Sequence, residues 1–345
     1  MDIASGLSSV SFESGLTEDE KKLAHLRARS AGLTFCGCAH AAYLCSLLHS
    51  LRCAISRHSA AEDAQLRVGI LGMGHMGKQL LLSILEVVPI QPSNIKVSTR
   101  RPESAVEFAQ MGVECFFDSG RLAAWADVLF LCCLPSHLPT ACAGLRSHLP
   151  RRCLVSTFVS AVPVTRLNKL LGHDFVLKPE YSFTDGDAAG VWLPCTRVTA
   201  ALRDPVLIEA SCPLAASGGV SLGLTWVCAV LYSLLNVCTS AGVGSSDALS
   251  LVGGLFEDEC KRSLHLIPQH FISSSCASSL ATDKSFPWIS LTDAQTKDTP
   301  LLRALSDNES MQRCICAAYK SLLTPGKLSS SDSKRPHAKL KHVNT

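Results

Sequence analysis

The sequence has little charge and few aromatic side chains. Of its 345 residues, 18% are charged and 6% are aromatic, and the formal net charge at pH 7 is +3. A nucleic-acid-binding surface needs clustered Lys and Arg, and single strands are usually held by stacking on aromatic rings. This composition meets neither requirement, so we expect no nucleic-acid partner.

The first residues lack the basic stretch and the apolar core of a secretory signal peptide. They carry Glu13, Glu18, Asp19 and Glu20, which makes them more acidic than a typical mitochondrial transit peptide. The 17 cysteines are scattered through apolar runs and suit a reducing compartment, where thiols stay free. We expect a cytoplasmic protein, with a mitochondrial location left open.

Two long stretches lack charge, but neither is strongly hydrophobic. Residues 31–51 and 210–246 contain no Asp, Glu, Lys or Arg. Both are long enough to span a bilayer, yet small and polar residues dilute them. We predict a helix packed on the domain surface for the first stretch. For the second we predict helices buried in a helical domain or a dimer interface, and we expect no membrane association.

Potential metal ligands gather in and just after the first of these stretches. Cysteine and histidine occupy six positions there: Cys36, Cys38, His40, Cys45, His49 and Cys53. The paired C-x2-C spacing of structural zinc sites is absent. We therefore interpret the cysteines as small hydrophobic residues on a buried helix face and expect no metal site.

The most informative segment reads Arg-Val-Gly-Ile-Leu-Gly-Met-Gly-His-Met-Gly-Lys at residues 67–78. A short apolar run predicts a buried strand, and apolar residues at helical spacing after it predict a helix. Between them lies Gly-x-Gly-x-x-Gly, at Gly72, Gly74 and Gly77. In a dinucleotide-binding fold the first glycine permits the tight turn, the second lets a pyrophosphate approach the backbone, and the third lets the helix pack closely. The phosphates then face the positive end of the helix.

The same segment begins like the phosphate loop of nucleotide hydrolases, with Gly-x-x-x-x-Gly-Lys from Gly72 to Lys78. That loop needs Ser or Thr at the next position to hold magnesium, and Gln79 stands there instead. No acidic residue ends the later strand at 128–131 either. We therefore favour dinucleotide binding over nucleotide hydrolysis.

Strand and helix patterns alternate beyond the glycine motif. Further strands are expected at 95–99, 113–117, 127–133, 153–158 and 175–177, with one or two more within 186–200, and helices at 119–125, 139–149 and 163–171. Alternation on this scale predicts an α/β fold with a Rossmann, doubly wound parallel sheet.

The pattern becomes helical from about residue 205, which predicts a smaller all-α domain after the Rossmann sheet. Helices are expected around 226–235, 246–256 and 299–323, with a serine-rich linker at 273–280. We divide the chain into an N-terminal helical extension (1–65), a Rossmann NADP-binding domain (66–204), a helical substrate and dimerisation domain (205–324) and a disordered basic tail (325–345).

The end of the second expected strand indicates which dinucleotide is bound. A fold selective for NAD usually places Asp or Glu there, about 20 residues beyond the glycines, to bind the ribose 2′-hydroxyl. The residues at this position are Ser98, Thr99, Arg100 and Arg101. Two hydroxyls and two guanidiniums suit a 2′-phosphate, and no carboxylate repels it. We predict NADP in preference to NAD.

Taken together, these features resemble the pyrroline-5-carboxylate reductase family from Val68 to about Leu171. The resemblance includes the glycine loop and residues 98–101, 127–135 and 154–163. It implies a C-terminal helical domain that dimerises and NAD(P)H-dependent reduction of a cyclic imine. The residues it places at the cofactor are Gly72, Met73, Gly74, His75, Met76 and Gly77 (pyrophosphate), Ser98, Thr99 and Arg100 (2′-phosphate), Leu134 and Pro135 (nicotinamide) and Ser160 (its ribose).

The substrate half of the family pattern matches less well. The family's Met-Pro-Asn-Thr-Pro run after the sixth strand is replaced by Leu-Lys-Pro-Glu-Tyr-Ser at 177–182. Its Ser-Gly-Ser-Gly-Pro-Ala-Tyr turn has only a remnant at 216–220, and its Ser-Pro-Gly-Gly-Thr-Thr loop has no counterpart. The resemblance therefore supports the cofactor site more strongly than it supports proline biosynthesis.

No catalytic residue is assigned by the sequence. Lys178, Glu180 and Tyr181 follow the sixth strand and His137 follows Pro135, where each is either a proton donor or an ordinary surface residue. We expect an oxidoreductase that transfers a hydride to a small imine or carbonyl substrate, with CH–NH or C=N groups favoured, and that works as a homodimer. The alternative is a catalytically silent protein that binds NADP(H) as a sensor or as a scaffold for a protein partner.

Overall fold

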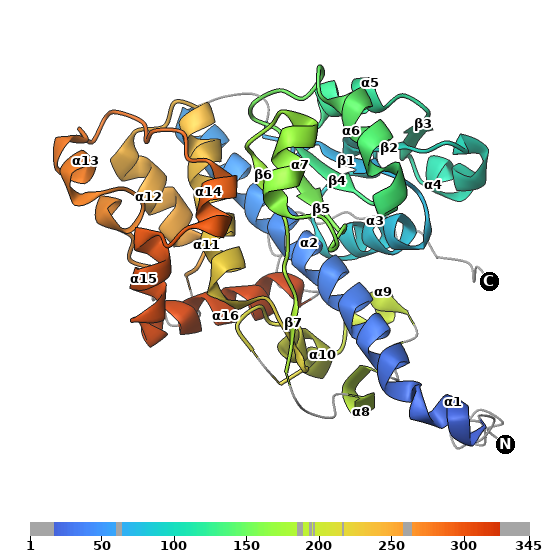
Figure 1. Cartoon of the computed structure of the whole chain (residues 1–345). Helices are drawn as coiled ribbons and strands as arrows, with labels where there is room; N and C mark the ends of the chain where they lie inside the picture. Colours follow the sequence, from blue (N-terminus) through green and yellow to red (C-terminus); the bar gives the residue numbers. More distant parts are fainter. Residues whose placement is uncertain are drawn as a thin grey trace, which may run out of the picture.

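The computed structural model describes residues 17–59, 64–184, 189–192, 195, 197–215, 217–257 and 264–324. The basic tail expected at 325–345 lies outside these residues. The central feature is a six-stranded parallel sheet with the strand order β3-β2-β1-β4-β5-β6 (Figure 1). Its strands are β1 (Val68–Leu71), β2 (Ile95–Ser98), β3 (Glu114–Phe116), β4 (Val128–Leu131), β5 (Leu154–Thr157) and β6 (Val176–Leu177). The predicted Rossmann fold is confirmed.

Helices cover both faces of the sheet because the strand order reverses direction at β1. Right-handed crossovers on either side of this point place their helices on opposite faces. One face carries α3 (His75–Val87) and α4 (Val106–Gln110), whereas the other carries α5 (Ser119–Trp125), α6 (Leu138–Leu145) and α7 (Val164–Leu171). These crossovers leave the α3 face uncovered beside β4, β5 and β6.

The long helix α2 (Ala24–Ser59) fills this uncovered half of the face. It packs beside α3, and its middle shares one hydrophobic core with Phe130, Leu154 and Leu177 of the sheet. The expected surface position for residues 31–51 is therefore wrong, since most of them are fully buried between the sheet and the later helices (Figure 1).

Helix α2 continues through Gly32 without a break, and the chain breaks at Leu23, after the short helix α1 (Glu18–Lys22). Gly32 serves packing, because a Cβ added there would lie 3.0 Å from the buried ring of Trp192.

The chain after the sheet is mainly helical, as predicted. Its helices are α10 (Pro205–Ala210), α11 (Gly223–Ser240), α12 (Ser245–Gly254), α13 (Ser274–Ser279), α14 (Leu291–Thr296), α15 (Pro300–Ser306) and α16 (Glu309–Leu323). The buried helix α11 is at the centre of this group and contacts α2, whereas α14 contacts both α11 and β6. The domain boundaries at 65/66 and 204/205 remain predictions. Helices α2 and α14 each contact both the Rossmann part and the later helical part, so contacts do not divide the chain at these positions.

Three local expectations are wrong. The described residues within 186–200 form short helices, α8 (Ala189–Trp192) and α9 (Val198–Ala201), in place of strands. The serine-rich stretch contains α13, because Ser273 caps it by accepting a hydrogen bond from the N–H of Cys276. The helix expected at 299–323 is divided into two, because Asn308 caps α16 just after α15 ends.

A second, two-stranded sheet joins the two parts of the chain. In it β8 (Val220–Ser221) pairs antiparallel with β7 (Ser182–Phe183).

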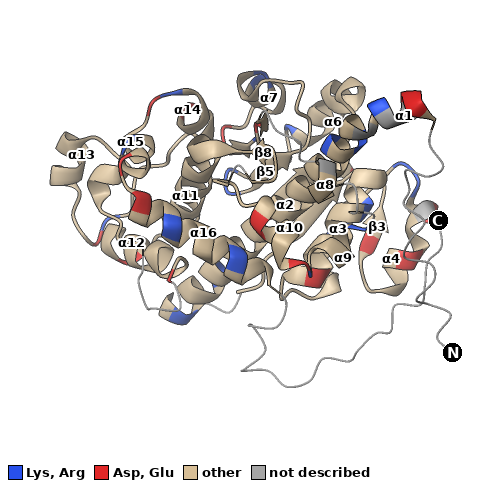
Figure 2. Cartoon of the chain, turned by 90° about the horizontal axis from the view of Figure 1, so that it is seen from below, with Lys and Arg blue, Asp and Glu red and all other residues tan. Residues whose placement is uncertain are grey.

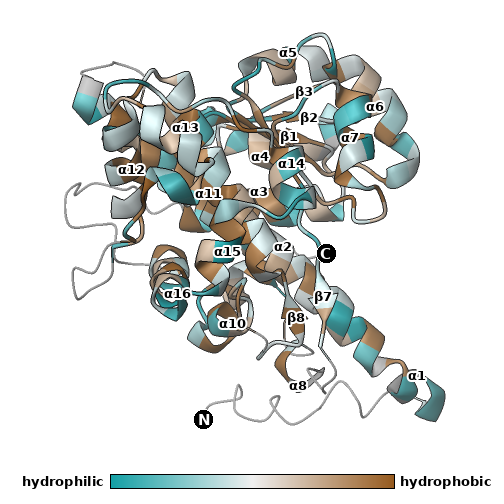
Figure 3. Ribbon diagram, turned by 60° about the vertical axis from the view of Figure 1, so that its left-hand side comes forward, coloured by the Kyte–Doolittle hydropathy of each residue, from teal (hydrophilic) through white to brown (hydrophobic). Residues whose placement is uncertain are grey.

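Two described helices are long and apolar enough to cross a membrane, over His25–His58 and Gly223–Ser240. In the fold, 83% and 67% of their most apolar windows are buried, an arrangement that core helices of soluble proteins share. Hydrophobic residues are prominent on α11, whereas hydrophilic residues gather where α2 approaches α1 (Figure 3). Basic and acidic residues are interspersed along the described ribbon without a long run of one sign (Figure 2).

Candidate functional site

The turn between β1 and α3 has the geometry expected of a dinucleotide loop. Gly72 adopts φ 102°, a left-handed conformation that glycine tolerates best. Its N–H donates to the carbonyl of Ser98 at 2.9 Å, which ties the turn to β2. A Cβ added to Gly72 would lie 2.9 Å from the carbonyl oxygen of Cys132, so β4 also approaches this position closely. The turn therefore lies where β2, β1 and β4 all end.

The other two glycines of the motif have different surroundings. Gly74 is exposed at the N-cap of α3, and a Cβ added there would meet no atom within 4 Å. At Gly77 an added Cβ would lie 2.1 Å from the carbonyl oxygen of Gly72, so the helix can approach the turn only without a side chain. The main chain at Gly74 is thus open to a ligand, at the end of a helix where backbone N–H groups lack intrahelical partners.

The remaining loop residues differ in exposure. Met73 is buried in the core and Met76 is half-buried, whereas His75 is exposed. Lys78 points away from the loop to pair with Glu107 on α4, with Nζ 3.3 Å from the carboxylate. This lysine is therefore engaged outside the glycine loop, unlike the lysine of a phosphate loop.

The end of β2 presents hydroxyls and guanidiniums. The hydroxyl of Ser98 is buried and has no hydrogen-bond partner within the described structure. Thr99 is half-buried, and its hydroxyl accepts a hydrogen bond of 3.4 Å from the N–H of Arg101, while Arg100 is exposed. An orphaned hydroxyl beside an open glycine loop fits a bound nucleotide, because a buried hydroxyl without a partner costs free energy.

The predicted nicotinamide residues lie at the same edge of the sheet. Leu134 is 64% exposed although it is hydrophobic, and Pro135 and Ser160 are exposed as well. Helix α2 also reaches this edge, since a Cβ added to Gly37 would lie 3.0 Å from Phe158 and 3.1 Å from Met76. Sequence reasoning missed this wall of the site, because nothing local connects residue 37 with residue 158.

The candidate proton donors are mostly engaged within the protein. Lys178 is buried, and its Nζ is 2.8 Å from the carboxylate of Glu180. His137 is exposed at the N-cap of α6, but its side chain makes no capping hydrogen bond. Tyr181 is held by a histidine of α2, as described next. The structure thus places these four residues near one edge without bringing them to one point.

His40 of α2 links Tyr181 to the helical part of the chain. Its Nε2 is 2.7 Å from the carbonyl oxygen of Ser211, which can only accept, so Nε2 carries the proton. The other nitrogen, Nδ1, then accepts from the Tyr181 hydroxyl at 3.0 Å. Burial lowers the pKa of His40 to about 4, although the bond to Ser211 opposes the shift, and burial raises the pKa of Tyr181. At neutral pH this pair is uncharged and fixed in direction.

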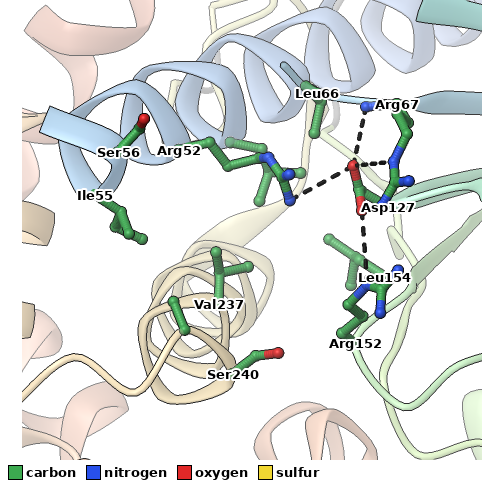
Figure 4. A pocket seen from close by; sticks show the side chains of 12 residues that line it. Arg52, Ile55, Ser56, Leu66, Arg67, Asp127, Arg152, Leu154, Val237 and Ser240 are labelled. Atoms are coloured by element: carbon green, nitrogen blue, oxygen red, sulfur yellow. Dashed lines mark hydrogen bonds and ion pairs between the residues drawn. The ribbon is translucent and has the colours of Figure 1, made fainter. Parts of the chain in front are cut away.

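A second polar cluster lies at the opposite, amino edge of the sheet. Asp127, just before β4, is 7% exposed and receives two hydrogen bonds from the Arg67 guanidinium and one from the Arg67 N–H. Arg52 of α2 and Arg152 also approach this carboxylate, and all four residues line a cavity of about 550 Å³ (Figure 4). The sequence held a signal for the Arg67–Asp127 pair, since β1 and β4 are neighbours in register just beyond these residues.

The potential metal ligands of α2 do not come together. Among the described residues, no group of three or more His, Cys, Asp or Glu side chains is arranged to hold a metal ion. The cysteines at positions 36, 38 and 45 are buried and free, and burial raises the pKa of each thiol, to about 12 for Cys36 and Cys38. They act as small core residues here.

Comparison with known proteins gives a family match over the glycine loop and most of the sheet. Residues 67–160 match the family described as NADP oxidoreductase coenzyme F420-dependent. The chain is 38% identical over 340 residues to the mouse NADP-dependent oxidoreductase domain-containing protein 1, covering 92% of this chain and 93% of that protein. It is also 28% identical over 109 residues to the pyrroline-5-carboxylate reductase of Escherichia coli, covering 31% of this chain and 40% of the enzyme.

Solved structures of low sequence identity are similar to parts of the chain. The pyrroline-5-carboxylate reductase of Coxiella burnetii is 15% identical, with a TM-score of 0.32, and covers 76% of this chain and 100% of its own. The pyrroline carboxylate reductase of Plasmodium falciparum with NADP bound is 13% identical, with a TM-score of 0.31, and covers 75% of this chain and 97% of its own.

Proposed function

Because this chain belongs to the family of NADP-dependent oxidoreductase domain-containing protein 1, within the pyrroline-5-carboxylate reductase-like oxidoreductases, we propose that it transfers a hydride from NADPH to a small imine or carbonyl substrate. The observation that carries this proposal is the open main chain at Gly74, beside a β2 end that offers hydroxyls and guanidiniums and no carboxylate. A diphosphate fits the first feature, and a 2′-phosphate fits the second.

In this proposal the protein binds and orients the cofactor, which supplies the hydride when bound. The N–H groups of the first turn of α3 receive the diphosphate over Gly74, while Ser98, Thr99 and Arg100 receive the 2′-phosphate. Leu134 and Pro135 lie against the nicotinamide, and Ser160 lies near its ribose. The exposed apolar surface of Leu134 would be covered by the ring, which excludes water from that side.

We also propose that the chain forms a homodimer through its helical part and works in the cytoplasm without a membrane or nucleic-acid partner. Light scattering after size exclusion tests the dimer, and cell fractionation tests the location. A monomer at micromolar concentration would contradict the proposed dimer. Recovery of the protein with membranes would contradict the proposed cytoplasmic location.

One observation favours a second function, that of a catalytically silent NADP(H)-binding protein. The side chains of Lys178 and Tyr181 are engaged with Glu180 and His40, so neither is directed to an open site as a proton donor. Steady-state oxidation of NADPH with pyrroline-5-carboxylate and a panel of imines and ketones separates the two functions. Turnover with any of them supports the reductase, whereas NADPH binding by fluorescence titration without turnover supports the silent protein.

A further inference from the structure

The cavity at the amino edge of the sheet lies far from the glycine loop. It is a half-open cavity lined by the second half of α2, the last turn of α11 and residues at the start of β1, β4 and β5 (Figure 4). Its volume, about 550 Å³, is in the range of sites that hold small organic molecules. The proposed cofactor site is at the other edge of the sheet, so this cavity is separate from it.

Among the described residues, one wall of the cavity carries three guanidiniums around the carboxylate of Asp127. Arg67 holds Asp127 in a two-point pairing, with its nitrogens 2.9 and 3.1 Å from the two oxygens. Arg52 and Arg152 approach the same carboxylate less closely, at 3.5 and 3.9 Å. Arg152 is half-exposed and lies at the cavity margin, so it can turn to a ligand at low cost (Figure 4). Planar guanidiniums bind carboxylates through paired hydrogen bonds.

The rest of the lining is mainly apolar. The hydrophobic lining residues are Leu48, Ile55, Leu66, Leu154, Val237 and Ala241. Ser56 and Ser240 are the uncharged polar lining residues, from α2 and α11. A ligand that matches both walls has one anionic head and an apolar body. Inorganic phosphate satisfies only the first wall, and an uncharged alcohol only the second.

We propose that this cavity binds a small amphiphilic carboxylate, with its head at Arg152 and Arg52 and its hydrocarbon chain along Leu48, Leu154 and Val237. The carboxylate head joins the cluster as an anion beside Asp127. The hydrocarbon chain is removed from water by the apolar wall, which favours binding in proportion to the area buried. The proposal is independent of the reductase activity, because it concerns the opposite edge of the sheet.

Isothermal titration calorimetry of the full chain with decanoate, 1-decanol and inorganic phosphate tests the proposal. We expect decanoate to bind measurably, and decanol and phosphate to bind at least tenfold more weakly, because decanol lacks the charge that guanidiniums bind and phosphate lacks the hydrocarbon chain that the apolar wall covers. Arg152→Gln should weaken decanoate at least tenfold. Ser240→Trp, at an exposed position that lines the cavity, should do the same by filling space. Arg166→Gln on the exposed side of α7 is the matched control and should change nothing.

Absence of decanoate binding would overturn the proposal, as would equal affinity for decanoate and decanol or for decanoate and phosphate. Unchanged decanoate affinity in both Arg152→Gln and Ser240→Trp would also overturn it, because binding would then lie elsewhere. NADPH affinity should be the same in all variants. If the wild-type protein does not bind NADPH, the proposed function is contradicted, but the decanoate result still tests the cavity.

Discussion

The two edges of the parallel sheet are built from different chemistry. The carboxyl edge consists of main chain at Gly72–Gly77, the hydroxyls of residues 98 and 99, and the neutral Tyr181–His40 pair. The amino edge consists of charged side chains, with Asp127 among three arginines. Helix α2 serves both edges, because His40 and Arg52 lie about 18 Å apart along its axis at 1.5 Å per residue.

This contrast separates the proposed nucleotide site from an ion-pair cluster that stabilises the fold at the wall of the second cavity. At the carboxyl edge, donor groups remain open, as at Gly74, or orphaned, as at Ser98, and a ligand completes them. At the amino edge, Asp127 already has close partners, and removal of that carboxylate leaves positive charges facing one another. Damage to the first edge should therefore affect nucleotide binding, and damage to the second should affect stability.

The largest expected effect is that of Gly74→Asp on nucleotide binding. The new side chain has room in the free protein, but its carboxylate would occupy the space of the diphosphate and repel it. We expect NADPH affinity to fall at least a hundredfold, about 3 kcal/mol or more, with little change in the urea midpoint. Fluorescence titration and urea unfolding measure the two quantities. Retained NADPH affinity would show that the diphosphate does not lie over Gly74.

Asp127→Asn should lower stability and leave NADPH affinity nearly unchanged, the reverse of what we expect for Gly74→Asp. The substitution leaves Arg67 and Arg52, both partly buried, around a neutral amide, which we expect to lower the free energy of unfolding by about 3 kcal/mol. NADPH affinity at 25 °C should stay within twofold, because the glycine loop is at the other edge. Arg152→Gln is the control and should cost less than 1 kcal/mol, since Arg152 is half-exposed. If Asp127→Asn loses NADPH binding but keeps its stability, the nucleotide depends on the amino edge and our placement of it at the carboxyl edge is wrong.

The buried His40 predicts an acid-sensitive carboxyl edge. Its pKa is about 4 in the fold, against 6.5 for an unperturbed histidine, so the unfolded chain binds a proton that the folded chain does not. The free energy of unfolding is therefore highest above pH 6.5, where His40 is neutral in both states, and it falls as the pH is lowered toward 4. At pH 5 the loss due to His40 is about 2 kcal/mol. Urea unfolding at pH 7 and pH 5 should show a smaller pH effect in His40→Gln. An equal loss in both proteins would show that other groups cause it.

The smallest expected effect is a change in nucleotide preference. In Arg100→Ala combined with Arg101→Ala, we expect NADPH to bind about tenfold more weakly, while NADH changes by less than twofold, because only NADPH carries the 2′-phosphate. Competition titrations with the two reduced nucleotides measure this ratio. Equal losses for both would indicate that the arginines affect the loop as a whole.

Local patterns were sufficient to predict the sheet and the glycine loop. Short apolar runs predict β1, β2 and β4, although the expected bounds 95–99 and 127–133 extend beyond the observed 95–98 and 128–131, and Gly72–Gly77 marks the turn. Composition was misleading where one side chain decides the structure: Ser273 starts a helix in a stretch that reads as a linker, and Asn308 divides what reads as one helix. Capping depends on where a single side-chain oxygen lies, and the average composition of a stretch does not indicate that position.

Long-range contacts could not be predicted in the same way. Helix α2 is only mildly apolar and carries no distinct apolar stripe, so its sequence indicates neither how deeply it is buried nor against which face of the sheet it packs. The Tyr181–His40 bond joins residues 141 positions apart, so nothing in either neighbourhood indicates it. Arg67 and Asp127 are 60 positions apart, yet their pairing follows once β1 and β4 are placed side by side.

The position of α2 in the chain has a consequence for synthesis. This helix precedes every strand of the sheet that it covers, so it emerges from the ribosome before its binding surface exists. Its cysteines and leucines then remain in contact with water or a chaperone until β4, β5 and β6 have been made, roughly 10 s later at about 10–15 residues per second. Docking of α2 on the sheet must therefore wait for β6, and its contacts with α11 and α16 form later still, so the first long helix becomes fully buried only once most of the chain has been made.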